Sequence, residues 1–341
     1  MIIDFINSHH WVSLFIFVAL IICAILVNKF IIVKLPLKIK RTLQVIGGTA
    51  AVIVLGFSLF SIFFLNSNSN IDSITELSDN TTSSQWQVDF MDYNELHKYS
   101  TGENTVIALI DSGISEFQSS TINKNVKESI DDSIYDVNGH GTMMYSLLSG
   151  YENEILGISP NAQINSYKVV DKTGVINGDV LANAIISAHK DDVDIINISL
   201  GSFHSNPKVK KAIDDAVNDG IIVIASSGDY AANDMLFPAN QENVISVGAI
   251  DEHKKVWNQS NAYESCDILA PGVDILTLDA NKKIFNSTGT SQATALISGY
   301  VSLILSYAKE KGCNIDYCDI LEKVHRISKC ESTYLYELVN I

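Results

Sequence analysis

Residues 106–113 read Val-Ile-Ala-Leu-Ile-Asp-Ser-Gly, and this stretch decides the fold. Five consecutive apolar residues are typical of a strand that is buried on both faces of a parallel sheet. In such sheets, ligand sites lie at the carboxyl ends of the strands. Asp111 stands at that end of the predicted strand, so we predict a functional site there.

Similar apolar runs recur along the chain, and segments with helical patterns separate or follow them. The further predicted strands are residues 193–200, 221–225 and 244–249. The predicted helices are residues 142–148, 180–190, 208–217 and 291–309. Alternation of this kind predicts an α/β fold in which helices cover both faces of a mostly parallel sheet.

Two further segments place reactive side chains beside glycines, where backbone can approach a substrate closely. They are Asn138-Gly139-His140-Gly141-Thr142 and Gly289-Thr290-Ser291. A lone His is usually a surface or core residue, and a Ser that opens a helix is usually an N-cap. In the chain order Asp111, His140, Ser291, however, these residues form an orienting carboxylate, a general base and an activated hydroxyl. We therefore predict a catalytic triad.

Other candidates near the triad are assigned to ordinary surface roles. Asp131, Asp132 and Asp136 lie in a polar loop and are predicted to be solvated. Glu152, Asn153 and Glu154 offer the oxygen ligands that calcium prefers, but three polar residues in a turn are more often solvated. Structural calcium therefore stays open, and no other metal or cofactor is predicted.

The three motifs and their flanking residues resemble the subtilisin-like serine proteases (subtilases, peptidase family S8) over about residues 85–341. The resemblance implies a subtilisin-like three-layer sandwich around a mostly parallel sheet, and a serine endopeptidase acting on peptides or proteins. It also implies that two segments form the walls of the pocket for the residue before the scissile bond. The substrate-binding residues so implied are Ser199, Leu200, Gly201, Ser226, Ser227 and Gly228.

Two of the departures from the family pattern bear on catalysis. Where the family has Ala-Ala-Gly-Asn, whose amide completes the oxyanion hole, this chain has Asp229 after Gly228. An ionised Asp can only accept hydrogen bonds, so we predict that desolvation raises the Asp229 pKa and that the protonated acid donates in the oxyanion hole. The alternative is that the backbone N–H of Ser291 and a water stabilise the oxyanion instead. Where the family's serine motif ends in proline, this chain has Ala295, which predicts a looser start to the helix.

The first 65 residues predict a membrane anchor. Residues 11–33 and 43–65 are apolar runs of the length that spans a bilayer, and residues 1–10 lack the basic start of a signal peptide. Lys34, Lys38, Lys40 and Arg41 lie between the two runs, which places that loop in the cytoplasm and both termini outside. Residues 66–84 are predicted to be a flexible tether, and residues 85–341 an extracytoplasmic peptidase domain in the cell membrane of a bacterium.

The charge of the chain excludes one class of partner. The net charge of the whole chain is −16, from 23 basic and 39 acidic side chains. The first 65 residues hold five of the basic and one of the acidic side chains, so residues 66–341 carry 18 basic and 38 acidic ones. So acidic a domain should repel nucleic acid.

Four cysteines lie outside the predicted membrane helices: Cys266, Cys313, Cys318 and Cys330. Four cysteines allow three complete disulfide pairings, and the sequence leaves the choice open.

We thus expect a membrane-tethered serine endopeptidase that processes exported peptides or proteins. The sequence leaves open whether these are secreted peptide or bacteriocin precursors, or envelope proteins. The alternative is a catalytically weak relative that binds peptides as a receptor or scaffold, which Asp229 and the missing proline favour. Oligomeric state, physiological substrate and cleavage preference are left open by the sequence.

Overall fold

The computed structural model describes residues 85–118, 135–171, 174 and 176–328. All of them lie in the second of two compact units of the chain, Asp72–Ile341. The predicted membrane segments 11–33 and 43–65 and the tether 66–84 lie outside the described residues. Among the residues that are described, none of the helices has the length and apolar character that a bilayer crossing needs.

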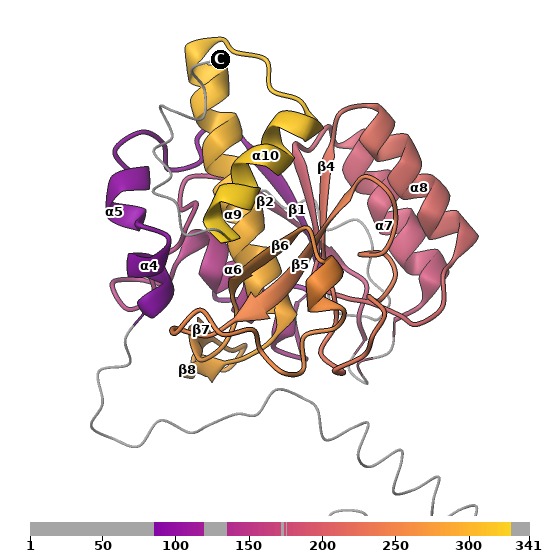
Figure 1. Cartoon of the computed structure of the whole chain (residues 1–341), viewed down its shortest axis with the longest axis horizontal. Coiled ribbons are helices and arrows are strands. Elements are labelled where there is room, and N and C mark those ends of the chain that lie inside the picture. The colour runs from indigo at the N-terminus through magenta and orange to yellow at the C-terminus, as the bar shows by residue number, and fades with distance from the viewer. Residues whose placement is uncertain (1–84, 119–134, 172–173, 175, 329–341) are drawn as a thin grey trace, which may run out of the picture. The chain divides into compact units, whose positions relative to one another are not determined.

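A sheet of six parallel strands forms the centre of the domain (Figure 1). Its order is β2-β1-β3-β4-β5-β6, and a two-stranded antiparallel hairpin, β7-β8, is separate from it. The strands are β1 Val106–Asp111, β2 Gln163–Lys168, β3 Ile195–Ile198, β4 Ile222–Ser226, β5 Val244–Ile250, β6 Ile268–Pro271, β7 Ile275–Leu278 and β8 Ile284–Ser287. Because the six strands run in one direction, the ends of β1, β3 and β4 meet at one edge.

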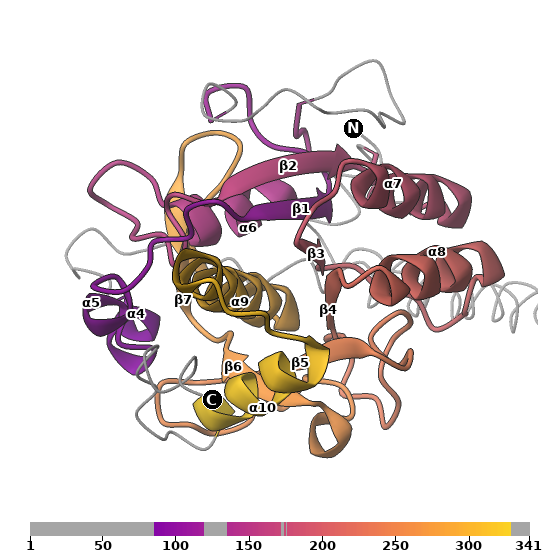
Figure 2. The same ribbon diagram turned by 90° about the horizontal axis from the view of Figure 1, so that it is seen from above.

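Helices cover both faces of this sheet, as Figure 2 shows. The helices are α4 Trp86–Phe90, α5 Tyr93–Leu96, α6 His140–Ser149, α7 Gly178–Lys190, α8 Pro207–Asn218, the short 3₁₀ turn Tyr263–Ser265, α9 Thr290–Lys311 and α10 Tyr317–Ser328. Successive residues of a strand face opposite sides. In β1, Ile107 and Leu109 accordingly pack in the cluster with α6 and α9, and Ala108 and Ile110 in the cluster with α7 and α8. The predicted three-layer α/β fold is confirmed.

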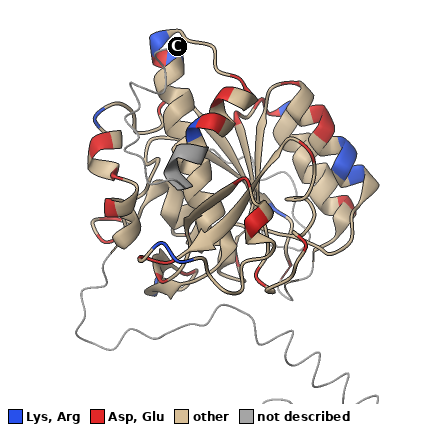
Figure 3. Cartoon of the chain, viewed as in Figure 1, with Lys and Arg blue, Asp and Glu red and all other residues tan. Residues whose placement is uncertain are grey.

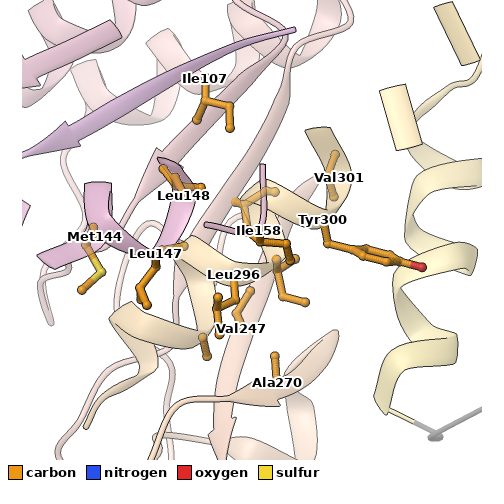
Figure 4. Close-up of a cluster of buried hydrophobic side chains, with 14 of the residues drawn as sticks. Ile107, Met144, Leu147, Leu148, Ile158, Val247, Ala270, Leu296, Tyr300 and Val301 are labelled. Carbon is orange, nitrogen blue, oxygen red and sulfur yellow. The ribbon is translucent and has the colours of Figure 1, made fainter. Parts of the chain in front are cut away.

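Helix α9 is the apolar centre of one layer (Figure 4). Leu296 and Val301 of this helix are fully buried, beside Leu147 of α6 and Val247 of β5. Each large aliphatic side chain so buried contributes roughly 1.5–3 kcal/mol relative to exposure. The helix that carries Ser291 is therefore fixed along much of its length by the core.

The start of α9 is regular although the family proline is missing. The helix runs without a break from Thr290 to Lys311, and Ala295 is fully buried within it. A helix interior favours Ala over Pro because Ala keeps its backbone N–H and does not clash with the preceding turn. The missing proline therefore does not interrupt the helix, and the looser start stays a prediction.

In the ribbon view of Figure 3, the chain carries charged residues of both signs, and acidic residues occur on several elements. On α8, Lys210 and Lys211 each pair with an aspartate four residues later, Asp214 and Asp215, at 3.2 and 2.7 Å. Exposed pairs of this kind contribute little to stability, about 0.3–0.5 kcal/mol each. They do make α8 well suited to face solvent.

Candidate active site

Asp111 is the last residue of β1 and is only 1% exposed. Its Oδ1 accepts a hydrogen bond from the Ser112 backbone N–H at 2.7 Å. Both carboxylate oxygens also face His140 Nδ1, at 2.8 and 3.0 Å. A carboxylate can only accept, so Nδ1 carries the proton and the other ring nitrogen, Nε2, is the basic one. This is the tautomer that a general base needs.

His140 is the first residue of α6, directly after Gly139, whose φ of 101° is a left-handed conformation that favours glycine. Gly141 follows, and a Cβ there would lie 2.1 Å from the carbonyl oxygen of Gly113. The two glycines thus allow the start of α6 to approach the end of β1. The predicted pairing of Asp111 with His140 is present because these two element ends meet.

Ser291 lies in the first turn of α9 and is 8% exposed. Its Oγ donates to the carbonyl oxygen of Ser199 at 3.2 Å, and the Ser199 hydroxyl donates to the Ser291 carbonyl at 3.3 Å. The nucleophile candidate is therefore held against the segment that follows β3. A hydroxyl has one proton, so Ser291 must turn this O–H bond away from Ser199 before it can pass the proton to a base.

Asp136 organises the start of α6, and here the sequence prediction was wrong. Predicted to be solvated, Asp136 is only 6% exposed. Its Oδ1 accepts from the backbone N–H groups of Asn138 and Gly139 at 2.9 and 2.8 Å and from the Ser112 hydroxyl at 2.9 Å. Its Oδ2 accepts from the N–H and hydroxyl of Thr142, at 2.9 and 2.6 Å.

These five bonds tie the residues next to both members of the Asp111–His140 pair to one carboxylate. The negative charge also lies at the N-terminal end of a helix, where the macrodipole favours it. Asp136 is a positioning residue that the sequence analysis missed, because a polar loop gives no sign of which aspartate is buried. Asp131 and Asp132, its neighbours in that prediction, lie outside the described residues.

Asp229 lies beside the N-terminus of α9. Its Oδ1 accepts from the backbone N–H of Thr290 at 2.9 Å and from the Thr290 hydroxyl at 2.6 Å. The other oxygen, Oδ2, would be 2.8 Å from a Cβ on Gly289, so glycine makes room for the carboxyl. Thr290 immediately precedes Ser291, and the carboxyl is therefore close to the predicted nucleophile, where the resemblance expects the oxyanion hole.

The two predicted walls of the substrate pocket follow neighbouring strands. Ser199, Leu200 and Gly201 come after β3, whereas Ser226 ends β4 and Ser227 and Gly228 follow it. The strands pair in register, with Ile198 opposite Ala225, so the walls begin side by side at the edge where Asp111 lies. Both walls also touch α9, through the Ser199–Ser291 bonds and a bond from the Gly228 N–H to the Thr290 hydroxyl at 3.2 Å.

The segment considered for calcium forms a turn. Tyr151 and Ile155 pair as an isolated antiparallel bridge, and Glu152, Asn153 and Glu154 are exposed between them. Across the described ranges, no three His, Cys, Asp or Glu side chains gather closely enough to hold a metal ion.

The cysteines that the structure describes are free thiols: Cys266, Cys313 and Cys318. Cys330, the fourth member of the open pairing, lies outside the described residues. Burial raises the pKa of Cys266 to about 11, whereas Cys313 and Cys318 are exposed. A thiol of so high a pKa is a poor nucleophile at neutral pH, so Cys266 does not compete with Ser291 for that role.

Comparison with known proteins agrees with this geometry. The profile described as "Subtilase family" matches residues 102–317. The chain is similar to the major intracellular serine protease of Bacillus subtilis, with 32% identity over 61% of this chain and 70% of that one. It is also similar to the thermophilic serine proteinase of Bacillus sp. strain AK1, with 29% identity over 72% of this chain but only 62% of that protein, less than two thirds of its length.

Among solved structures, the prenylagaramide maturation protease PagA has a similar fold. The TM-score is 0.61, the sequence identity is 23%, and the likeness covers 72% of this chain and 96% of that one. At this identity the comparison supports the fold. The relatives, together with the matching profile, support a serine endopeptidase.

Proposed function

Because the chain belongs to the subtilase family of serine proteases, we propose that it is a membrane-tethered serine endopeptidase that cleaves exported peptides or proteins. The observation that carries the proposed chemistry is the Asp111–His140 pair, with Nδ1 at 2.8 and 3.0 Å from the two carboxylate oxygens. In a Ser-His-Asp catalytic triad, a buried carboxylate orients the histidine that acts as the general base, as Asp111 does with His140. Ser291, at the start of the core helix α9, supplies the nucleophile.

In the proposed reaction, Ser291 Oγ attacks the carbonyl carbon of the scissile bond while its proton passes to His140 Nε2. The charged imidazolium is stabilised by Asp111. Collapse of the tetrahedral intermediate breaks the C–N bond, and His140 gives its proton to the leaving amine. Water then hydrolyses the acyl-enzyme by the same proton transfers, which returns Ser291 to its starting state.

The oxyanion needs hydrogen-bond donors, and the first turn of α9 supplies backbone N–H groups that have no acceptor within the helix. We propose that Asp229 adds a donor in its protonated form. Its Oδ1 accepts two bonds from Thr290, as either a carboxylate oxygen or the carbonyl oxygen of a carboxylic acid can, so desolvation has to outweigh the preference of these bonds for the ionised form. In that case Oδ2 carries the proton.

A fluorophosphonate label on the full-length chain tests the proposed activity. We expect a covalent adduct on Ser291, found by peptide mass spectrometry, which disappears in Ser291→Ala and falls sharply in His140→Ala. An absence of adduct in the wild-type protein would contradict the proposal, because an activated serine reacts with this reagent. It would favour the second candidate, a peptide-binding relative, for which the carboxyl of Asp229 in place of an amide is the supporting observation.

The membrane tether and the location outside the cell are proposed from the sequence alone. The apolar runs at 11–33 and 43–65 and the basic loop between them support two membrane helices with the peptidase outside. The test is digestion of intact protoplasts with an added protease. We expect the peptidase domain to be degraded, and a protected domain would reverse the proposed orientation.

A further inference from the structure

The space between the two substrate walls is partly filled by one side chain, Leu236. A Cβ built on Gly201 would lie 2.7 Å from Leu236 Cβ, and one built on Gly228 would lie 2.7 Å from Leu236 Cγ. Gly201 belongs to the wall after β3 and Gly228 to the wall after β4. Leu236 is 5% exposed, so its side chain is packed directly against both glycines.

The backbone around Leu236 is fixed to the same two walls. Its N–H donates to the carbonyl oxygen of Ser227 at 2.9 Å. The next residue, Phe237, exchanges two backbone hydrogen bonds with Ser202, at 2.8 and 2.9 Å, and its ring is buried in the core beside α7 and α8. Since these three bonds tie Leu236 and Phe237 to the segments that follow β3 and β4, the backbone of Leu236 cannot move out from between them without breaking this pairing.

From this packing we infer that Leu236 blocks the inner end of the pocket and restricts cleavage to sites after a small residue: glycine, alanine or serine. The inference rests on the proposed function, because it places the residue before the scissile bond (P1) between the two walls. A leucine or phenylalanine at P1 would have to occupy volume that Leu236 already fills. Well-packed interiors accept extra methylene groups only at the cost of displaced side chains and backbone.

An aromatic pair continues the two walls outward and agrees with a narrow pocket. Phe203 lies two residues after Gly201 and Tyr230 two residues after Gly228. Their ring centroids are 5.3 Å apart, although the two residues are 60% and 52% exposed. Contact between the rings links the walls beyond the glycines and opposes their separation. A large P1 side chain would need the walls to move apart.

The test uses the full-length protein and peptidyl diphenyl phosphonates that differ only at P1, with Gly, Ala, Leu or Phe analogues. These reagents phosphonylate the activated serine, so their second-order rate constants report P1 selectivity even without a known substrate. Each methylene that a pocket cannot accommodate costs roughly 10-fold or more. We expect the Ala reagent to react at least about 100-fold faster than the Leu and Phe reagents with wild-type protein.

Leu236→Gly should narrow this selectivity by raising the rate with the Phe reagent at least about 10-fold relative to Ala. Leu236→Ala, which is the safer variant for folding, should fall between Gly and wild type. The matched control is Leu181→Ala in α7, which removes a buried leucine (7% exposed) away from the walls and should slow all reagents alike.

Wild-type protein that reacts as fast with the Phe or Leu reagent as with the Ala reagent would overturn the inference without any variant. Unchanged selectivity in both Leu236 variants would overturn it as well. Failure of the proposed function itself gives a different result. In that case even the small and unselective fluorophosphonate would leave Ser291 unmodified.

Discussion

Replacing Asp136 by Asn should destabilise the domain and slow turnover, although the change removes no atom from the triad. The side chain keeps its shape but loses its charge and gains two donors where it had only acceptors. The amide oxygen can serve the three donors that face Oδ1: the N–H groups of Asn138 and Gly139 and the Ser112 hydroxyl. The amide nitrogen then faces the N–H and the hydroxyl of Thr142.

The cost can be worked out from these contacts. The Thr142 hydroxyl can rotate, but its backbone N–H cannot, and a buried N–H without an acceptor costs about 1–3 kcal/mol. Loss of a negative charge at the N-terminus of α6 adds about 0.3–1 kcal/mol. With the three remaining bonds no longer charge-assisted, the total loss in free energy of unfolding is about 2–4 kcal/mol. For a domain of this size that is a fall in Tm of about 4–16 °C.

Thermal unfolding by circular dichroism measures this fall, with Ser291→Ala in both proteins so that self-digestion does not interfere. The matched control is Asp219→Asn, because the Asp219 side chain is 69% exposed and, within the described part of the chain, pairs with His189 at the surface. We expect that control to shift Tm by no more than about 2 °C. Turnover is measured separately, in protein that keeps Ser291. There Asp136→Asn should lower kcat more than it raises KM, since it loosens the residues beside Asp111 and His140. A Tm equal to that of the control would refute the account of α6.

Two further predictions concern groups whose protonation matters. Asp229→Asn should equal wild-type activity at low pH and exceed it at alkaline pH, because only the wild type loses its donor as the carboxyl ionises; a gain independent of pH would show that the carboxyl never donates. Cys266, with a pKa raised from 9.0 to about 11, should hold about 100-fold less thiolate at pH 8 than an unshifted thiol. Since thiolate nucleophilicity rises about 10-fold over the same shift, Cys266 should react with iodoacetamide about 10-fold more slowly. Mass spectrometry should find Cys313 modified first, and equal rates for the two in the folded protein would contradict the burial of Cys266.

The strands with long continuous apolar sequences, β1, β3, β4 and β5, could be predicted, whereas β2, β6, β7 and β8 were missed. The prediction for residues 106–110 falls within β1, and 244–249 within β5. Strand β2 was missed because Gln163-Ile-Asn-Ser-Tyr-Lys168 lacks an apolar run, although its last five residues are all buried. Asn165 and Lys168 are buried because β2 lies beside β1, a consequence of the tertiary fold that local sequence does not reveal.

The same division holds for the site. Asp111 and His140 could be found because each lies in a short motif beside glycines, and the structure brings them within hydrogen-bond distance. Asp136 and Leu236 could not. Asp136 accepts from five donors that the fold brings together. Four come from residues at or just before the start of α6, and the fifth is the hydroxyl of Ser112, which follows β1. The role of Leu236 depends on two glycines that come from different strands.

The central claim is that Asp111, His140 and Ser291 act as one catalytic unit. The most direct measurement is the turnover of a cleavable peptide by Ser291→Ala, His140→Ala and Asp111→Asn, each checked for an unchanged circular dichroism spectrum, and by the double variant Ser291→Ala/His140→Ala. We expect each single change to remove nearly all turnover, and the double variant to lose little more than the worse of its two single changes. Losses that multiply in the double variant, or a single variant that retains wild-type turnover, would contradict the claim.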